Sequence, residues 1–389
     1  MNSTAAGFHT VLVPFQDTND SFEFTVPTRY TKLQFIDAGG QGIVVSANDS
    51  ATGTKVAIKK MTKPFANPKA AQRAFREFAL LSSINHPNVI RVFSVFTPQT
   101  AVQDFNDVYL VMEFVEDSLS KIINKVRLDH QTLSFFIYQL LCAVNHLHRA
   151  GITHRDLKPD NIVVNVAYTS TQQAEVTLKV LDFGLARQVN QSAGAQMSAY
   201  VVTRYYRAPE VVLGLAYAEK VDVWSIGCIF AEMITHEVLF PGRDHKDQWN
   251  TIVRNMGTPS EKFIASLAPQ IAAAVRKGPS GNPIPLEQLI PDAKIPADDP
   301  QNPHWTAVNA RQLITKMIAV DPSERCSITE ALQDPYVRCW YREDQVNAPS
   351  LPILYDRLFD GDGQPSLEVL KSAIFDEVKH IESSHNVFG

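Results

Sequence analysis

Three short motifs in a fixed order constrain this chain more than any other feature of its sequence. The first runs His154-Arg155-Asp156-Leu157-Lys158-Pro159-Asp160-Asn161, the second is Asp182-Phe183-Gly184, and the third is Ala208-Pro209-Glu210. Their side chains include a carboxylate that can accept a proton, an amine that can neutralise negative charge, and the hard oxygen ligands that Mg²⁺ prefers. A chance match to all of them in this order is very improbable.

The motif set resembles the signature of the protein kinases, and the resemblance extends from Tyr30 to Val337. It implies that Asp156 accepts the proton of a substrate hydroxyl and that Lys158 neutralises charge on the phosphoryl group in transfer. It also implies that Asn161 and Asp182 hold Mg²⁺. The cofactors expected from the resemblance are therefore ATP and Mg²⁺.

Two further features match the same family. Asp222-Val223-Trp224-Ser225-Ile226-Gly227 resembles the buried helix that anchors the catalytic loop, and Arg325 is placed like the family's ion-pair partner for Glu210. Because a buried ion pair is costly to break, loss of either partner is expected to unfold the C-terminal lobe locally.

A glycine-rich run precedes these motifs: Ile36-Asp37-Ala38-Gly39-Gly40-Gln41-Gly42-Ile43-Val44. It resembles the ATP-binding loop of the kinases, with Asp37 where the family has its first glycine. Gly39 and Gly42 allow the backbone to approach phosphates that a Cβ atom would keep away. A glycine-rich hairpin turn without a ligand is the alternative interpretation. Asp37 is expected to weaken ATP binding without abolishing catalysis.

Lys59 and Glu77 extend the predicted ATP site. Lys59 ends a β-type run, and a lysine on a buried strand needs a charged partner. Phosphates and the Glu77 carboxylate would supply one, whereas the alternative is that Lys59 reaches water from a strand end. By the resemblance, Met112 matches the gatekeeper position, and Glu113 and Val115 give backbone hydrogen bonds to adenine.

Patterning along the chain predicts an α+β, bilobal protein-kinase fold with a β-rich N-lobe and a helical C-lobe. One helix interrupts the strands, opening at Asn67-Pro68 and burying a face that includes Ala71 and Phe78. The predicted domains are a loose or partly ordered N-terminal arm (1–29), a kinase domain (30–337) and a C-terminal extension (338–389). Within the kinase domain, the N-lobe covers 30–112, the hinge 113–117 and the C-lobe 118–337.

The segment Ser198-Ala199-Tyr200-Val201-Val202-Thr203-Arg204-Tyr205-Tyr206-Arg207 narrows the family. It is similar to the activation segment of the mitogen-activated protein (MAP) kinases, in which a Thr-x-Tyr pair is doubly phosphorylated. With Phe96-Thr97-Pro98-Gln99 and Phe240-Pro241-Gly242-Arg243-Asp244, it resembles the c-Jun N-terminal kinases (JNK). Ser-Ala-Tyr in place of Thr-Pro-Tyr resembles the divergent KGB branch of nematode JNK-like kinases.

Phosphorylation of Ser198 and Tyr200 is expected to activate the enzyme, because each phosphate adds about two negative charges that arginine side chains can bind. By the resemblance, the arginines that bind the first phosphate are Arg73, Arg76, Arg155 and Arg187, and those that bind the phosphotyrosine are Arg204 and Arg207. The alternative is that these arginines are solvated surface charges. Ser198 keeps the hydroxyl, so loss of the middle proline bears on the choice of upstream kinase rather than on activation.

Composition excludes several other classes of protein. The 389 residues carry a net charge of -5 and 45% hydrophobic residues, without the basic bias of a nucleic-acid-binding or membrane-surface protein. The four cysteines lie far apart and show no zinc-ligand spacing. No signal peptide and no long apolar run are visible, so no membrane span is expected.

The sequence therefore predicts a stress-type MAP kinase that transfers the γ-phosphate of ATP to Ser or Thr of protein substrates, by resemblance at Ser/Thr-Pro sites. The alternatives are a pseudokinase scaffold, which the presence of Lys59, Asp156 and Asp182 disfavours, and an active p38-like MAP kinase, which the lack of Gly at position 199 disfavours. Expected partners are an upstream dual-specificity MAP kinase kinase, phosphatases, protein substrates and docking-motif proteins such as transcription factors. We expect no direct nucleic-acid or membrane partner, and a cytoplasmic and nuclear location.

Two peripheral features complete the sequence-based predictions. Asp356, Asp360 and Asp362 are the candidates for an acidic patch that binds basic docking peptides, with Glu116 and Asp117 less favoured. The segment Asn165–Thr177 is expected to be a surface hairpin insertion.

Overall fold

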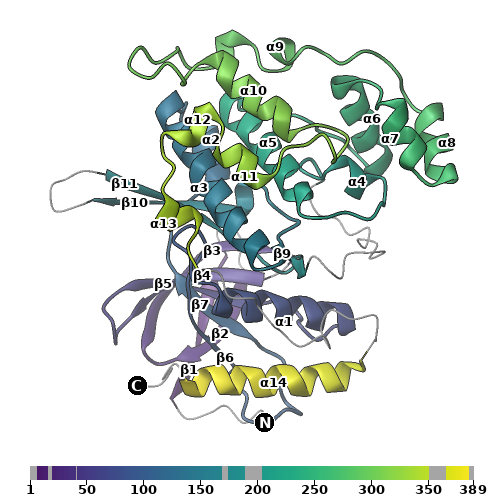
Figure 1. Cartoon of the computed structure of the whole chain (residues 1–389). Helices are drawn as coiled ribbons and strands as arrows, with labels where there is room; N and C mark the ends of the chain where they lie inside the picture. The colour runs from purple at the N-terminus through teal and green to yellow at the C-terminus, as the bar shows by residue number, and fades with distance from the viewer. Residues whose placement is uncertain are drawn as a thin grey trace. The chain divides into compact units, whose positions relative to one another are not determined.

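The computed structural model of the chain describes residues 7–15, 20–40, 42–168, 174–188, 204–349 and 365–384 (Figure 1). These residues group into two compact units. Unit 1 draws on Met1–Glu116, Asp182–Leu185 and Ile353–Gly389, and unit 2 draws on Asp117–Leu181 and Ala186–Pro352. The first division, between Glu116 and Asp117, falls inside the segment predicted as the hinge.

Unit 1 is built on a five-stranded antiparallel sheet in the order β3-β4-β5-β7-β6. The strands are β3 (Tyr30–Gly39), β4 (Gly42–Asp49), β5 (Lys55–Met61), β6 (Val92–Phe96) and β7 (Tyr109–Glu113). Successive strand residues point to opposite faces. One face contributes Val45, Ile58 and Val111 to a buried core cluster, in which Phe96 and Tyr109 stack at 4.9 Å.

A β-hairpin covers this core face. Its strands β1 (Phe8–Pro14) and β2 (Ser21–Pro27) pair antiparallel, and Phe24 and Val26 are fully buried in the same cluster. We predicted a loose or partly ordered arm over residues 1–29, and the structure forms a paired hairpin at these two strands. In β2, Phe22, Phe24 and Val26 alternate with polar residues, and this is the pattern of a strand whose apolar side covers another sheet face.

Helix α1 (Pro68–Ser83) follows β5 and confirms the predicted start at Asn67-Pro68. The Asn67 side chain accepts a hydrogen bond of 2.9 Å from the Ala70 N–H, and Pro68 occupies the first turn. Ala71 and Phe78 are fully buried, as the periodicity predicts.

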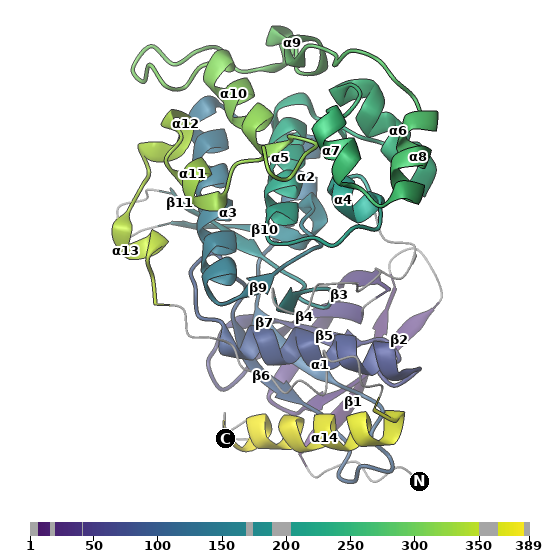
Figure 2. The ribbon, with the colours of Figure 1, turned by 45° about the vertical axis from the view of Figure 1, so that its right-hand side comes forward.

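Helix α14 (Leu367–Ser384), near the C-terminus, is also part of unit 1. Leu370, Ile374 and Val378, one turn apart, are fully buried, and α14 lies alongside α1 in both views (Figures 1 and 2). The Glu382 carboxylate also accepts a hydrogen bond of 2.7 Å from the Thr97 N–H. The C-terminal helix is thus part of the unit that carries α1.

Unit 2 is mainly helical. Its longer helices are α3 (His130–Arg149), α5 (Lys220–Thr235), α6 (His245–Met256), α8 (Pro269–Lys277) and α10 (Ala307–Met317). Its shorter helices are α2 (Leu119–Lys125), α4 (Pro209–Val212), α7 (Glu261–Ser266), α9 (Leu286–Leu289), α11 (Ile328–Leu332), α12 (Pro335–Arg338) and α13 (Glu343–Val346), with 3₁₀ turns η1 (Pro159–Asn161) and η3 (Asp292–Lys294). α5 is buried almost all round, as its continuous apolar pattern indicates.

Short strands complete unit 2: β8 (Asp117–Ser118), β9 (Ile152–Thr153), β10 (Ile162–Tyr168), β11 (Ala174–Val180) and β12 (Arg187–Gln188). β10 and β11 pair antiparallel across the predicted hairpin insertion. A β-rich unit and a helical unit confirm the predicted α+β organisation. Within the described part of the chain, no helix has the length and apolar character needed to cross a membrane.

Candidate active site

Lys59 and Glu77 meet in the interior of unit 1. Lys59 lies on β5 and is 8% exposed, Glu77 lies on α1 and is 3% exposed, and their side chains form an ion pair. This contact confirms the partner predicted for Lys59 and excludes the alternative in which Lys59 simply reaches water. It also ties α1 to the sheet through one charged contact.

Neighbouring carboxylates stabilise the charged form of Lys59. Burial lowers the pKa of the Lys59 ammonium, but attraction by Glu77 and Asp182 outweighs that effect and leaves the pKa raised. Burial raises the pKa of the Glu77 carboxyl, and Lys59 opposes that shift. Unit 1 therefore holds a charged ammonium group near two carboxylates.

The Asp182-Phe183-Gly184 motif is held by Arg76, which is 3% exposed. Its guanidinium donates a hydrogen bond of 2.7 Å to the Gly184 carbonyl, and the Asp182 carboxylate accepts one of 3.2 Å from the Gly184 N–H. Sequence reasoning missed this contact, since it placed Arg76 among the phosphate-binding arginines. In this structure at least one donor of Arg76 serves the backbone of unit 1.

The glycine-rich run forms the hairpin between β3 and β4, where Gly39 pairs with Gly42. A Cβ atom on Gly42 would lie 2.6 Å from the Lys60 carbonyl oxygen, so only glycine fits there. The Asp37 carboxylate is exposed and accepts a hydrogen bond of 2.9 Å from the Ala38 N–H. Ile36, Ala38 and Gly40 lie on the same hairpin, whereas Gln41 is outside the described residues.

Strand register divides the predicted ATP-binding residues between two faces. Val44 pairs with Lys59, and Ile43 pairs with Lys60. Because neighbouring residues alternate, the side chain of Ile43 lies on the face opposite Lys59, where it packs against the core cluster. We predicted Ile43 among the ATP-binding residues; the structure leaves only its backbone for that role.

The remaining ATP-site residues lie where β7 ends. Met112 pairs with Ala57 on β5 and is mostly buried. The Glu113 N–H donates to the Arg91 carbonyl at 3.0 Å, and the Glu113 carboxylate accepts from the Arg91 N–H at 2.8 Å. Within the described residues, the backbone of Val115 has no hydrogen-bond partner, so its groups are available to a ligand.

Unit 2 brings the catalytic-loop residues together. The Asn161 amide nitrogen donates to the Asp156 carbonyl at 2.8 Å and to its carboxylate at 3.1 Å. The Lys158 ammonium lies 3.6 Å from the same carboxylate. A proton acceptor, a cation and an amide thus converge within one short loop.

Asp222, at the start of α5, fixes this loop through its backbone. Its fully buried carboxylate accepts hydrogen bonds from the N–H groups of His154 (2.9 Å) and Arg155 (2.8 Å), and it contacts His148 Nε2 at 2.9 Å. Burial alone would raise the pKa of Asp222, but the hydrogen bond and charge of His148 hold it below its ordinary value. The predicted anchoring role of this helix is confirmed.

The predicted metal ligands fit a divalent cation in chemistry. The amide nitrogen of Asn161 donates to Asp156, so its amide oxygen is the atom that could coordinate a cation. Asp182 supplies a carboxylate. In the part of the chain that the structure describes, no cluster of three or more His, Cys, Asp or Glu side chains could hold a metal.

Two of the arginines predicted to bind phosphates, Arg155 and Arg187, lie near one tyrosine of unit 2. In unit 2, the Arg155 guanidinium lies 5.0 Å from the centre of the Tyr217 ring. Burial raises the pKa of the Tyr217 hydroxyl, and both Arg155 and Arg187 oppose the shift, so both arginines lie near it. Tyr217 is a residue that sequence reasoning missed, because no motif marks it.

The other arginines divide between the two units. Burial lowers the pKa of the Arg207 guanidinium; the nearby Asp156 opposes this shift and the nearby Arg204 adds to it. The Arg204 guanidinium donates a hydrogen bond of 2.6 Å to the Arg243 carbonyl. Arg73 lies on α1 in unit 1. The predicted phosphorylation sites Ser198 and Tyr200 lie outside the described residues, as do Asp356, Asp360 and Asp362.

A second buried ion pair lies in unit 2. Arg325 binds Glu210 through two parallel hydrogen bonds of 2.7 and 3.0 Å, and it also donates to the carbonyls of Lys220 and Ala319. Both charged side chains are almost fully buried. This confirms the predicted partner of Glu210.

Comparisons with known proteins support the same assignment. Residues 30–337 match the model of the family described as "Protein kinase domain". The chain is 48% identical to GLH-binding kinase 1 of Caenorhabditis elegans over 385 residues, which are 99% of this chain and 96% of that protein. It is 45% identical to the stress-activated protein kinase JNK of Drosophila melanogaster over 383 residues, which are 98% of each.

Proposed function

The chain belongs to the JNK-like MAP kinases, a stress-activated group of Ser/Thr protein kinases with the bilobal kinase fold, and on this premise we propose how its residues carry out the reaction. Asp156 accepts the proton of a substrate Ser or Thr hydroxyl. The hydroxyl oxygen then bonds to the γ-phosphorus of ATP, the bond to the bridging oxygen breaks, and ADP leaves. Lys158 neutralises charge on the transferring group.

The observation that carries this proposal is the intact pairing in each unit. In unit 1, Lys59 is charged, paired with Glu77 and near Asp182, so its ammonium can hold ATP phosphates. In unit 2, Asn161 and Lys158 contact the Asp156 carboxylate. The kinase family uses ATP and a divalent metal; here we assign the metal as Mg²⁺, which draws charge from the phosphates when Asn161 and Asp182 hold it.

Activation is proposed to follow phosphorylation of Ser198 and Tyr200 by an upstream dual-specificity MAP kinase kinase. Of the four arginines assigned to the first phosphate, Arg155 and Arg187 lie close to Tyr217 in unit 2, and Arg73 and Arg76 lie on α1 in unit 1. Arg204 and Arg207 suit the second. The added negative charges would then bind these arginines.

Substrate choice is the finer part of the proposal. We assign Ser/Thr-Pro sites, docking-motif proteins such as transcription factors as substrates, phosphatases as antagonists, and action in the cytoplasm and nucleus. These assignments extend the JNK-like membership and the sequence of the activation segment. The pseudokinase alternative requires loss of a reacting group, yet Lys59, Asp156 and Asp182 are all present.

The test is phosphate transfer from labelled ATP with Mg²⁺ to a Ser-Pro peptide. Protein phosphorylated at both Ser198 and Tyr200 is compared with unphosphorylated protein and with Asp182→Ala. We expect transfer by the first alone, and loss of stimulated activity in Ser198→Ala and in Tyr200→Phe. The matched Ser-Ala peptide should be a poorer substrate.

Each contrary outcome points to a different error. No transfer despite ATP binding would favour a scaffold role. Full activity of the double Ser198→Ala, Tyr200→Phe variant would reject the proposed activation. Equal use of the two peptides would reject the proline preference.

A further inference from the structure

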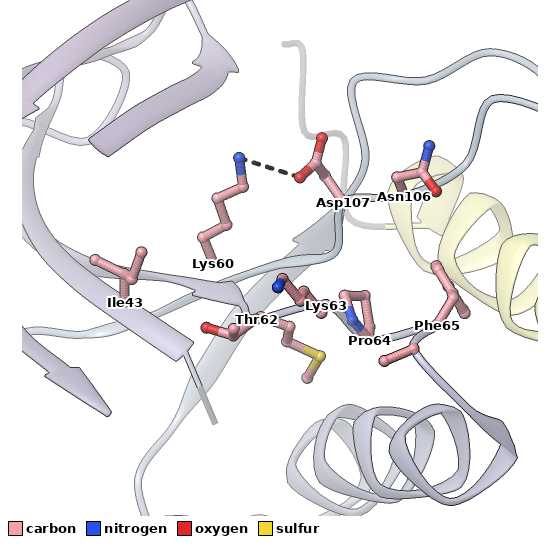
Figure 3. A pocket seen from close by; sticks show the side chains of 10 residues that line it. Ile43, Lys60, Thr62, Lys63, Pro64, Phe65, Asn106 and Asp107 are labelled. Carbon is pink, nitrogen blue, oxygen red and sulfur yellow. Dashed lines mark ion pairs between the residues drawn. The ribbon is translucent and has the colours of Figure 1, made fainter. Parts of the chain in front are cut away.

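A pocket of about 500 Å³ opens in unit 1, beside the connection from β5 to α1. Its walls include Ile43 of β4, Lys60 of β5, the connection residues Lys63 to Phe65, and Asp107 (Figure 3). The size falls in the range of small-molecule sites, about 300–1,000 Å³. The pocket is separate from Lys59, because Ile43 and Lys60 belong to the opposite face of the sheet.

One of the pocket's two cations is already neutralised. Lys60 forms an ion pair of 3.1 Å with Asp107, drawn as a dashed line in Figure 3, and it also donates to the Glu23 carbonyl at 3.1 Å. Lys63 is exposed and has no ion pair with any other described residue. The pocket therefore presents one uncompensated positive charge next to Pro64, which is buried, and Phe65, which is half-buried.

The backbone at this cation is unusual. Lys63 adopts a left-handed conformation, with φ of 42°, although it is not glycine and it precedes proline. Its carbonyl accepts a hydrogen bond of 3.0 Å from the Ala66 N–H, so a tight turn holds it. Such backbone outliers persist where the surroundings impose them, and they gather at functional sites.

We propose that this pocket is a second ligand site, which binds an amphipathic anion. The apolar body of the ligand, about one aromatic ring, contacts Ile43, Pro64 and Phe65. Its carboxylate or phosphate pairs with Lys63. The combination of an apolar wall with Lys63, which is unpaired among the described residues, selects an anion over a neutral or cationic molecule of the same shape.

The site is placed to influence the Lys59–Glu77 pair. The connection that forms its wall starts after Lys59 and leads into α1, which carries Glu77. The ring of Phe65 also packs against the ring of Phe105, with the ring centres 4.7 Å apart, and the rings of Phe105 and Phe375 of α14 have centres 5.2 Å apart. A ligand that favours this arrangement of the connection also favours the paired state, and this coupling rests on the proposed role of Lys59 in holding ATP.

The binding test uses 3-phenylpropanoate as the probe and the full chain labelled for ¹H–¹⁵N NMR. We expect a dissociation constant of about 1–10 mM, as for a small fragment, with the largest amide shifts at Ile43, Lys60, Lys63, Phe65 and Asp107. The alcohol 3-phenylpropan-1-ol should bind about three-fold more weakly, because it lacks the charge. Added salt should weaken binding of the carboxylate and leave the alcohol unchanged.

The matched variants are Lys63→Gln and Lys32→Gln. Lys32 is also an exposed lysine of unit 1 with a left-handed backbone (φ 54°), but it does not line the pocket. We expect Lys63→Gln to reduce carboxylate affinity to that of the alcohol, and Lys32→Gln to leave it unchanged. Equal binding of acid and alcohol, the largest shifts lying away from the pocket, or the same affinity in Lys63→Gln would overturn the assignment.

The coupling is tested with a non-hydrolysable ATP analogue. A saturating probe should tighten analogue binding about five-fold, and the analogue should tighten probe binding by the same factor. An unchanged analogue affinity with the probe bound would reject the coupling. Failure of the analogue to bind at all would contradict the proposed function instead, because NMR reads probe binding independently.

Discussion

The structure contains a buried ion pair in each unit, and the two pairs differ in how many hydrogen-bond partners the cation has. In unit 2, Arg325 makes two hydrogen bonds to Glu210 and donates to the Lys220 and Ala319 carbonyls. It also lies 5.3 Å from the centre of the Trp224 ring. In unit 1, Lys59 forms an ion pair with Glu77 and is also attracted by Asp182.

The difference separates a structural pair from a working one. The guanidinium of Arg325 is satisfied by groups of its own unit, so its contribution is to hold α4 and the segment before α11 in place. An ammonium group has three donors, and Lys59 gives one to Glu77. The remaining donors are what a phosphate ligand would require.

The largest expected effect is on stability, from Glu210→Gln. This change leaves the Arg325 guanidinium buried without a countercharge and should cost about 3–5 kcal/mol in unit 2. Hydrogen exchange of α4, α10 and α11 measures it without assuming that both units unfold together. Adding Arg325→Met should recover part of the loss, because the uncompensated charge is then gone. A cost below about 1 kcal/mol would contradict a saturated buried pair.

Glu77→Gln should reduce activity more than it reduces stability. Lys59 keeps the attraction of Asp182, so the stability loss should be smaller than for Glu210→Gln. Turnover of the Ser-Pro peptide should fall about 10–100-fold, the equivalent of losing a charged hydrogen bond. Glu368→Gln, at an exposed position of α14, is the control. If Glu77→Gln unfolds unit 1 as strongly as Glu210→Gln unfolds unit 2, the two pairs are not distinct.

Asp222 predicts an acid limit for unit 2. Its folded-state pKa is below the ordinary 3.8, so the native state binds the proton less tightly than the unfolded chain. The associated stability is present above that ordinary value and is lost as the pH falls through the folded-state pKa. Acid unfolding of unit 2, followed by hydrogen exchange, should become less steep in Asp222→Asn.

The same variant separates the acid effect from the loss of anchoring. At neutral pH, Asp222→Asn should cost about 1–3 kcal/mol, because the His154 and Arg155 N–H groups lose a charged acceptor. Wild-type and variant curves with equal acid slopes would show that other carboxylates govern the transition.

The smallest effect is expected from Glu382→Gln in unit 1. This carboxylate accepts from the Thr97 N–H and pairs with Lys379 at 2.8 Å. Its loss should cost about 1 kcal/mol, seen as faster exchange in α14 and β6. Asp376→Asn, on the exposed side of α14, is the matched control. Unchanged exchange in Glu382→Gln would show that apolar packing alone holds α14.

The motifs and the helices could be predicted from sequence because they depend on local rules. The Asn67-Pro68 start and the buried face of α1 follow from capping and from the period of the helix. The Lys59–Glu77 pair followed from the need of a buried lysine for a charged partner, and the Arg325–Glu210 pair followed from the family resemblance. The structure contains both. Cover of the core by β1 and β2 could not be predicted, since a short alternating run does not say what it covers.

Contacts between distant segments account for the rest of the site. Arg76 and Gly184 are far apart in the sequence, and no pattern links a guanidinium to one backbone carbonyl. The same holds for Tyr217 beside Arg155 and for the pocket at Lys63. Spacing identifies which residue types are present, whereas their distances depend on how strands and helices pack.

By itself, the sequence determined the reaction class, the order of the motifs, the start of α1 and the burial of α5, because these depend on side-chain chemistry and on spacing along the chain. Tertiary structure alone decided that Ile43 faces away from Lys59 and that Arg76 binds Gly184. It also decided that Lys60 pairs with Asp107, whereas Lys63 has no ion pair among the residues that the structure describes. The physical reason is that strand register and the packing of remote segments set which face each side chain occupies and which charges meet.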